Sequence, residues 1–382
     1  MANNNENKIL NVPHLRFPEF SGEWKKCIIQ DYGEVVTGNT PPTNNAEYYN
    51  NGSYLWASPA DLGINKNVTD TKTKLSLSGF KKTRNVPKGS VLVTCIGSTI
   101  GKMGMATETM SSNQQINSVV VNDKNNSDFV YYAICRAFPR YLSEVGVQAV
   151  PILSKSNFEK LPNYTTSRDE QNKIGYFLSL LDERIATQNK IIEDLKKLKS
   201  AIRKRRFSLL KDEHTESFEI NQLLTYEQPT PYIVANDEYS KDTTLIPVLT
   251  ANKGFILGYT DEDFGVYQKG ECIIFDDFTM DAKYVSFPFK VKSSAIKILT
   301  ARPCVNLRFM FEYLSYLELK SEEHKRHYIS EIASLVIEVP SLKRQNKIAF
   351  LMTSLDNKLT LEENAKLRYE DKKQYLLSQM FI

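Results

Sequence analysis

The sequence predicts an α+β fold: two mixed, strand-rich domains joined by two long antiparallel helices that form a coiled coil. Three observations predict it. A short segment recurs at a fixed offset, each copy opens a long stretch with helical periodicity, and each stretch follows a strand-like region. The chain has 382 residues, of which 41% are hydrophobic, and this is enough for two domain cores. We therefore expect one repeat used twice.

The repeat is clearest at the start of the two helical stretches. The run Gln171-Asn172-Lys173-Ile174 recurs as Gln345-Asn346-Lys347-Ile348, an offset of 345 − 171 = 174 residues. At the same offset Leu181-Asp182 returns as Leu355-Asp356, and Phe207 returns as Phe381. Two amphipathic helices can resemble each other by chance, but identities at one fixed offset favour a duplication.

Fainter matches extend the repeat upstream. Lys88–Val93 resembles Lys269–Ile274, each a turn followed by an apolar run, and Gln115–Val119 corresponds to Ala295–Leu299. We therefore expect a first strand-rich domain at residues 1–160 and a first long, central helix at 161–212. A second strand-rich domain at 213–340 and a second long, C-terminal helix at 341–382 complete the prediction.

Both helical stretches carry an imperfect coiled-coil seam. Residues 168–207 contain no Pro, and their apolar positions alternate in steps of three and four, interrupted by Gln188 and Lys199. The predicted seam comprises Leu178, Leu181, Ile185, Ile192, Leu195 and Ile202 in the first helix, and Met352, Leu355, Leu359, Tyr369 and Leu376 in the second. Polar breaks of this kind fix register and partner. Matching seams predict that the helices pair with each other, with the two domains at opposite ends. A plain scaffold rod, or a helix docked on its own domain, is the alternative.

Basic residues gather near the end of the first helix. They are Lys196, Lys197, Lys199, Arg203, Lys204, Arg205 and Arg206. Such a cluster suits the negative end of the helix dipole, and it also suits contact with DNA phosphates. The net charge of +4 leaves both interpretations open, because phosphate contacts require local positive charge only.

Composition points to a cytoplasmic protein. The five cysteines are scattered and odd in number, which indicates free thiols in a reducing compartment. The first residues are polar, with no signal-peptide core, and no apolar run approaches the ~20 residues that span a bilayer.

Motifs for catalysis are weak throughout. Gly97–Lys102 resembles a phosphate loop but has only three residues between its glycines, and Met103 stands where Ser or Thr would bind magnesium, so a strand–turn–strand is expected. Asp276, Asp277 and Asp281-Ala282-Lys283 form a faint nuclease-like set, and His324 with His327 lacks a third metal ligand. We therefore expect no catalytic residue, no metal and no cofactor in this chain.

Taken in order, the motifs resemble the specificity subunit of type I restriction–modification systems over nearly the whole chain. In the first half they are Phe17-Pro18-Glu19-Phe20 with Trp24, Gly38-Asn39-Thr40-Pro41-Pro42, Gly89–Val93, Gly97–Lys102, Asn113–Ile116, and Leu161-Pro162 leading to Glu170–Ile174 and Leu180-Leu181-Asp182. In the second half they are Tyr226–Thr230, Pro247–Ala251, Phe275–Phe278 and Lys292–Ile296. The second copy departs from the pattern, because Arg344 replaces Glu before Gln345 and Ser354-Leu355-Asp356 replaces the Leu pair.

The resemblance implies a non-catalytic subunit. Each recognition domain would read one half of a split, asymmetric double-stranded DNA target, and the helices would set the spacer and bind two methyltransferase subunits. Those subunits would carry S-adenosylmethionine, and motor–nuclease restriction subunits would join them. The rival interpretations are a coiled-coil interaction scaffold without DNA specificity and a self-contained nuclease or methyltransferase.

The side chains suited to base reading lie in the polar loops of the motifs, since Asn and Gln match adenine and Lys matches guanine. The first domain offers Asn39, Thr40, Ser98, Thr99, Lys102, Asn113, Gln114 and Gln115. The second offers Tyr226, Gln228, Thr250, Asn252, Lys283, Lys292 and Ser293. Ordinary turn chemistry is the alternative for each of them.

Overall fold

The computed structural model describes residues 11–144, 151–212, 214–250, 254–319 and 328–382. The chain forms two compact units: unit 1 comprises Met1–Lys190 and Asn364–Ile382, and unit 2 comprises Ile191–Glu363. The boundary falls within the two longest helices, α5 (Arg168–Ser208) and α8 (Leu342–Met380), so each unit contains one part of both. Asn252, His324 and His327 lie outside the described residues.

Unit 1 contains three sheets. A five-stranded sheet has the order β2 (Gly33–Thr37), β10 (Ile116–Val121), β7 (Val91–Thr94), β8 (Met103–Ala106), β4 (Asn67–Val68). A four-stranded sheet has the order β5 (Thr73–Leu75), β3 (Tyr54–Ala57), β9 (Met110–Ser112), β6 (Asn85–Val86), and β1 (Lys25–Ile28) pairs with β11 (Pro162–Thr165). The helices of this unit, besides its parts of α5 and α8, are α1 (Ile29–Tyr32), α2 (Leu77–Phe80), α3 (Ser127–Glu144) and α4 (Lys155–Glu159), with short 3-10 turns at Ala46–Tyr48 and Pro59–Asp61.

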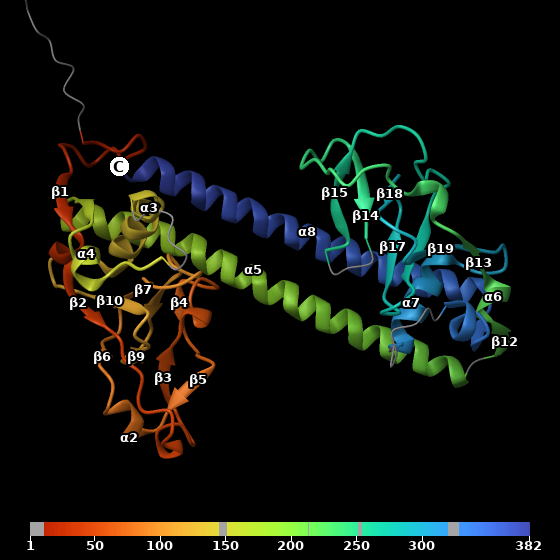
Figure 1. The fold of residues 1–382 in the computed structure, drawn as a ribbon, viewed down its shortest axis with the longest axis horizontal. Coiled ribbons are helices and arrows are strands. Elements are labelled where there is room, and N and C mark those ends of the chain that lie inside the picture. Colours follow the sequence, from red (N-terminus) through yellow and green to blue (C-terminus); the bar gives the residue numbers. More distant parts are fainter. Residues whose placement is uncertain (1–10, 145–150, 213, 251–253, 320–327) are drawn as a thin grey trace, which may run out of the picture. The chain divides into compact units, whose positions relative to one another are not determined.

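The main core of unit 1 lies between the five-stranded sheet, α3 and the long helices. Apolar residues of α3 such as Phe129 and Ile134 are fully buried there, against Val91 and Val93 of β7. Ile174 and Leu178 of α5 join the same core, as do Leu376, Leu377, Met380 and Phe381 at the end of the chain. Within unit 1, the four-stranded sheet and α2 lie away from α5 (Figure 1).

Unit 2 repeats this plan with different sheets. A four-stranded sheet has the order β13 (Leu224–Glu227), β19 (Ile296–Ala301), β16 (Cys272–Asp276), β17 (Ala282–Val285). A three-stranded sheet has the order β15 (Ile256–Thr260), β14 (Ile246–Leu249), β18 (Lys290–Val291), and β12 (Thr215–Glu219) pairs with β20 (Val336–Pro340). The helices are α6 (Ile220–Leu223) and α7 (Leu307–Leu317), with short helical turns at Leu209–Asp212, Thr230–Tyr232 and Tyr328–Ile332. Its main core joins α7 and the four-stranded sheet to Phe207 of α5 and Met352 of α8.

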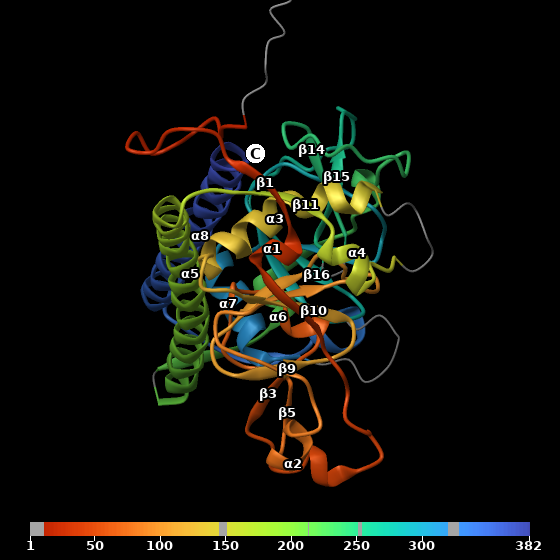
Figure 2. The same ribbon diagram turned by 90° about the vertical axis from the view of Figure 1, so that its left-hand side faces the viewer.

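The two long helices of the sequence prediction are confirmed as α5 and α8. Figures 1 and 2 both show them running side by side within each unit. Their direction follows from unit 2, where Lys196 of α5 pairs with Glu363 of α8, and Lys199 pairs with Asp356. Because the α5 partner advances along the chain as the α8 partner retreats, the helices are antiparallel. Among the described residues, no helix is both long and apolar enough to cross a membrane.

The seam residues combine helix pairing with docking on the domains. Leu178, Leu181 and Leu376 belong to the core of unit 1, whereas Ile202, Met352 and Leu355 belong to the core of unit 2. Ile192 is buried, while Ile185, Leu195, Leu359 and Tyr369 are half-buried along the middle of the helices. The predicted pairing of the helices and the alternative of docking on the domains are therefore both present, because each helix packs on domain cores as well as beside its partner.

Candidate nucleic-acid interface

Two loops of unit 1 that carry predicted reading residues lie together. The segment after β2 contacts the β9–β10 turn, because the Asn39 amide donates to the Ser112 carbonyl at 2.9 Å and the Gly38 amide donates to the Ile116 carbonyl at 3.0 Å. The Thr40 hydroxyl donates to Oε1 of Gln114 at 2.6 Å. Residues 74 positions apart in the chain are thus joined in one polar surface.

The third loop of unit 1 is the hairpin turn between β7 and β8. The strands pair antiparallel, and Gly97 and Gly101 have φ of 95° and 91°, the left-handed region that glycine tolerates. The loop leads into a strand, so the expected strand–turn–strand is confirmed and a phosphate loop, which opens a helix, is not formed. Nε2 of Gln115 donates to the Ile96 carbonyl at 3.4 Å and links this turn to the other two loops.

The eight candidates in unit 1 divide by what their side chains already do. Both polar ends of the Asn39 amide are used, since Nδ2 donates to the Lys82 carbonyl and Oδ1 accepts from the Arg84 amide. Asn113 is buried and bonds Gln115 at two points. Asn39 and Asn113 therefore shape turns, whereas Gln114, Ser98 and Lys102 are exposed and can meet a ligand.

A basic segment next to these loops was missed by the sequence argument. Lys81, Lys82 and Arg84 are exposed, and two hydrogen bonds from this segment hold Asn39. Nη1 of Arg84 also donates to the Thr37 carbonyl at 2.9 Å. The segment Lys81-Lys82-Thr83-Arg84 was visible as a charge cluster, but its nearness to Asn39, more than 40 positions away, was not.

In unit 2, parallel pairing of β14 with β18 brings two candidate segments to one edge. Parallel strands end on the same side, so Thr250 follows β14 where Lys292 and Ser293 follow β18. The Lys292 amide donates to the Leu249 carbonyl at 2.9 Å, and its ammonium lies 3.8 Å from Asp237. Lys292 and Ser293 are exposed, and Thr250 is half-buried.

Tyr226 lies on β13 and Gln228 just after it, next to a buried ion pair. Oε1 of Gln228 is 3.4 Å from Nζ of Lys297, and that ammonium is 3.4 Å from Oδ2 of Asp277. Both charged side chains of the pair are 1% exposed. Gln228 itself is exposed, whereas the ring of Tyr226 packs 5.6 Å from that of Tyr328, so only Gln228 presents its polar end to solvent.

Lys283 lies on β17 beside Asp281, at 3.0 Å. It lines a pocket with Arg203, Thr279 and Glu318 that includes none of the other candidates of unit 2. The structure therefore brings Thr250, Lys292 and Ser293 together and leaves Lys283 apart from them.

The carboxylates that faintly suggested a nuclease have structural roles. Asp276 accepts from the amides of Phe278 and Thr279, and Asp277 is paired with Lys297 and accepts from the Tyr328 amide at 2.8 Å. In the part of the chain that the structure describes, no group of three or more His, Cys, Asp or Glu is placed to hold a metal ion.

Two lysines of the long helices, Lys199 at a predicted break of the first seam and Lys373 in the second helix, form matched ion pairs. In unit 1, Lys373 of α8 donates to Asp182 of α5 at 2.6 Å. In unit 2, Lys199 of α5 donates to Asp356 of α8 at 2.5 Å. The offset of 174 relates Asp182 to Asp356 (356 − 182) and Lys199 to Lys373 (373 − 199), so the same pair recurs with the helices exchanged.

A third side chain joins each pair, and here the units differ. In unit 1 it is Tyr132 of α3, whose hydroxyl donates to Asp182. Burial, and then the nearby Asp182 carboxylate, raises the pKa of Tyr132 well above its ordinary value, so it stays a donor. In unit 2 the equivalent residue of α7 is Glu312. Its offset from Tyr132 is 180 residues (312 − 132), the same as the offset between Asn126 and Asn306 at the starts of α3 and α7 (306 − 126).

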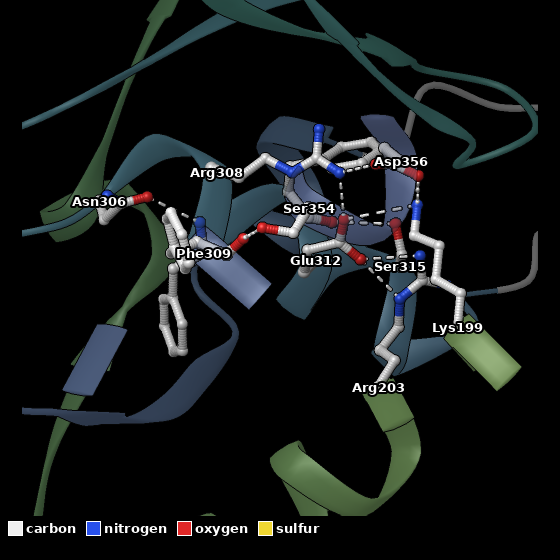
Figure 3. Close-up of polar contacts among 11 residues, drawn as sticks. Lys199, Arg203, Asn306, Arg308, Phe309, Glu312, Ser315, Ser354 and Asp356 are labelled. Atoms are coloured by element: carbon white, nitrogen blue, oxygen red, sulfur yellow. Dashed lines mark hydrogen bonds and ion pairs between the residues drawn. The ribbon is translucent and has the colours of Figure 1, made fainter. Parts of the chain in front are cut away.

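Glu312 is the centre of a charged network (Figure 3). Its carboxylate is fully buried and accepts from Arg203 at 2.7 Å and from Arg308 at 2.6 Å, with Lys199 at 3.7 Å. Arg308 and Lys199 also reach Asp356. Two carboxylates and three cations from α5, α7 and α8 thus compensate one another around the buried Glu312 carboxylate, and the other members are partly exposed.

Much of the basic cluster near the end of α5 is used in ion pairs inside unit 2. Lys196 pairs with Glu363, Lys197 with Glu193, Lys199 with Asp356, Arg203 with Glu312 and Lys204 with Glu318. Lys199 and Arg203 are largely buried in these pairs, whereas Lys196, Lys197 and Lys204 remain more than half exposed.

Comparison with known families gives a match over both halves. The family described as "Type I restriction modification DNA specificity domain" matches residues 21–197 and again residues 212–369. The two matches correspond to the two copies of the repeat.

Curated relatives carry related descriptions. The specificity subunit of type I restriction enzyme EcoR124I/EcoR124II of Escherichia coli is 40% identical over 185 residues, which cover 44% of this chain and 44% of that protein. The MjaIX specificity subunit of Methanocaldococcus jannaschii is 29% identical over 219 residues, covering 54% of this chain and 49% of that one. The chain thus spans less than half the length of these relatives.

Two solved structures share the fold. The S subunit of a type I restriction–modification system from M. genitalium aligns with a TM-score of 0.67 and 18% identity, covering 97% of this chain and 99% of that chain. A chain from a study of complex assembly and conformational transition of the type I R-M system aligns with a TM-score of 0.54 and 11% identity, covering 94% and 97%.

Proposed function

Because the chain belongs to the type I restriction modification DNA specificity domain family, we propose that it is the DNA specificity subunit of a type I restriction–modification complex. In this role it binds double-stranded DNA and assembles with methyltransferase and restriction subunits. It supplies recognition and assembly rather than chemistry, and S-adenosylmethionine belongs to the methyltransferase partner.

Each unit reads one half of an asymmetric target. The observation that carries this proposal is the contrast between the duplicated helix contacts and the unlike loops. A symmetric pair of identical readers would require a palindromic site, whereas two different surfaces in one chain do not. Unit 1 offers Gln114, Ser98 and Lys102, and unit 2 offers Gln228 and Lys292 as exposed groups suited to base edges.

The test is a methylation assay with the assembled methyltransferase on targets varied in one half at a time. Gln114→Ala is expected to relax discrimination in one half-site only, and Gln228→Ala in the other, because each side chain belongs to one unit. A lost amide–base contact corresponds to roughly 1–3 kcal/mol of discrimination. Each variant is the control for the other, and an equal loss on every sequence would point to a folding role and contradict the proposal.

The helix pair sets the distance between the half-sites and docks two methyltransferase subunits. α5 alone has 41 residues, about 60 Å at ~1.5 Å per residue, comparable with almost two turns of DNA at ~34–36 Å each. Matched insertion of one helical turn into α5 and α8 is expected to lengthen the spacer of the methylated target. Methylome sequencing of cells that carry the altered chain measures the spacer. An unchanged spacer would refute the proposal that the helix pair sets its length.

A salt titration distinguishes the proposed specificity subunit from an interaction scaffold without DNA specificity. The assembled complex is expected to shift specific duplex DNA in a salt-dependent manner, and to prefer it over a scrambled duplex. Equal binding to both duplexes at every salt concentration would favour a scaffold instead.

A further inference from the structure

The outer faces of α5 and α8 each carry one prominent aromatic ring near the start of the helix. Tyr176 is 67% exposed and Phe350 is 76% exposed. They are equivalent positions of the repeat, since 350 − 176 = 174. Tyr176 belongs to unit 1 and Phe350 to unit 2.

The surroundings of the two rings are organised in the same way. From Gln171 to Leu178 and from Gln345 to Met352, buried, half-buried and exposed residues follow one another in the same order at all eight positions. Oε1 of Gln171 accepts from the Asn126 amide at 2.8 Å, and Oε1 of Gln345 accepts from the Asn306 amide at 2.8 Å. The first two turns of each helix are therefore fixed on their domains in matching orientation.

The residues beside the rings match as well. Nδ2 of Asn126 donates to Oδ1 of Asn172 at 3.0 Å, and Nδ2 of Asn306 donates to Oδ1 of Asn346 at 2.9 Å. Three positions before each ring stands an exposed lysine, Lys173 or Lys347. Each patch thus presents an aromatic ring with an amide and an ammonium group one turn earlier.

Folding does not account for these rings. Ile174 and Leu178 face the core of unit 1, and Ile348 and Met352 face the core of unit 2, so positions 176 and 350 point outward. A single exposed aromatic is ordinary on a protein surface. Two at equivalent positions, each set in the same pattern of contacts, indicate a surface that is used twice.

We propose that Tyr176 and Phe350 are the anchors of two equivalent docking patches, each of which binds one copy of the same protein subunit. This inference rests on the proposed function, in which that subunit is the methyltransferase. Aromatic side chains dominate the binding energy of protein interfaces when a partner encloses them. Tyr176 and Phe350 lie off the seam, whose residues are buried or half-buried, so the two rings are available to a partner.

The charged groups beside the rings indicate what the partner's binding surface should carry. Each ring requires an apolar pocket in the partner. At the patch of unit 2, Lys347 is exposed and suits a carboxylate at the rim of that pocket. At the patch of unit 1, Glu19 of the same chain already pairs with Lys173, whose ammonium lies 4.9 Å above the ring of Phe17. The hydrogen bond from Lys173 lowers the pKa of Glu19, so this carboxylate is ionised at neutral pH.

The experiment measures the number of methyltransferase subunits bound to the full chain by native mass spectrometry, with affinities from calorimetry. Tyr176→Ala and Phe350→Ala are each expected to weaken one of two sites by roughly 30-fold or more, as for a hot-spot residue, and the double variant to weaken both. Tyr176→Phe and Phe350→Tyr are expected to retain two copies, because each ring already serves at the equivalent patch.

Tyr375→Ala is the matched control. Tyr375 lies on α8, is 62% exposed, and corresponds to Ala201 (375 − 174), so it has no aromatic equivalent. Its removal is expected to leave both sites intact, and thermal unfolding of all variants should match that of the original chain. If the original chain binds no methyltransferase, the proposed function fails. If it binds two copies and the Tyr176 and Phe350 variants do so equally well, the docking patches are refuted alone.

Discussion

Unit 1 and unit 2 share the contacts that attach their domains to the helices and differ in the loops that face outward. In unit 1, Phe381 packs on Phe129 with ring centroids 5.3 Å apart, and in unit 2 Phe207 packs on Phe309 at 5.3 Å. The β9–β10 turn that carries Gln114 corresponds to the turn before β19, where Ser294 stands at the offset of 180 residues. A repeat is maintained where contacts must be the same, and it diverges where the proposed DNA half-sites differ.

The shared contacts themselves contain one instructive difference. At equivalent positions, Tyr132 gives unit 1 a single neutral donor to Asp182, whereas Glu312 gives unit 2 a buried charge that holds three cations. Each of these side chains joins a lysine–aspartate pair, but Tyr132 does so as a neutral hydroxyl and Glu312 as a buried charge. The units should therefore respond very differently to substitution at this one position.

The largest effect is expected for Glu312→Ala. Removal of the buried carboxylate leaves Arg203 and Arg308 poorly compensated, and breaking a buried ionic network in this way costs about 3 kcal/mol or more in unfolding free energy. The matched change Tyr132→Phe removes a neutral hydroxyl that donates to Asp182 and accepts from Lys66 at 3.4 Å, and it is expected to cost less, about 1–2 kcal/mol. Urea denaturation of the two variants measures both. Equal losses would mean that the network in Figure 3 adds nothing beyond a neutral hydrogen bond.

Charge reversal of the matched lysines is expected to have the next largest effect. Lys373→Glu places two carboxylates together at Asp182, whereas Lys199→Glu adds a carboxylate beside both Asp356 and Glu312. We expect a loss of about 2 kcal/mol for the first and more for the second, since like charges repel strongly when they are partly buried.

A double reversal tests whether the ion pair itself is responsible. Asp182→Lys combined with Lys373→Glu restores opposite charges and should recover much of the stability lost in the single variant, as a double-mutant cycle would detect. No recovery in thermal unfolding would show that the pair does not contribute through its charge.

The sequence predicted the helices, their pairing and the duplication, because periodicity and repeats lie along the chain itself. It also marked Lys199 as a break in the seam. Its partner Asp356 is 157 positions away, and that of Lys373 is 191 positions away, so only the folded chain shows why these lysines are tolerated.

The reading surface was less predictable for a chemical reason. Asn39 and Gln114 carry the same amide group, and that group both shapes turns and matches adenine. Nothing along the chain indicates that the amide of Asn39 is occupied by Lys82 and Arg84 whereas Gln114 is exposed. The basic segment at residues 81–84 was missed because its place beside these loops depends on the packing of two sheets.

Arg84→Ala should separate phosphate contact from base reading in unit 1. Its exposed guanidinium lies beside the loops, so we expect weaker DNA binding on all sequences, by about tenfold or less, and a salt slope reduced by about one. Fluorescence anisotropy across a salt series measures both quantities. A loss restricted to one base pair would instead identify Arg84 as a reader of sequence.

The smallest effects, and the most equal, are expected at the caps that both units share. Asn126 and Asn306 each accept from the amide three residues later, Phe129 or Phe309, at 2.9 Å. Asn126→Ala and Asn306→Ala should each reduce the unfolding free energy by about 1 kcal/mol, the usual effect of losing such a cap. Because Tyr176 and Phe350 depend on the same contacts for their orientation, both variants should also weaken one methyltransferase site slightly. A clear inequality between the two caps, in denaturation or in binding, would contradict the equivalence of the two units at the helix starts.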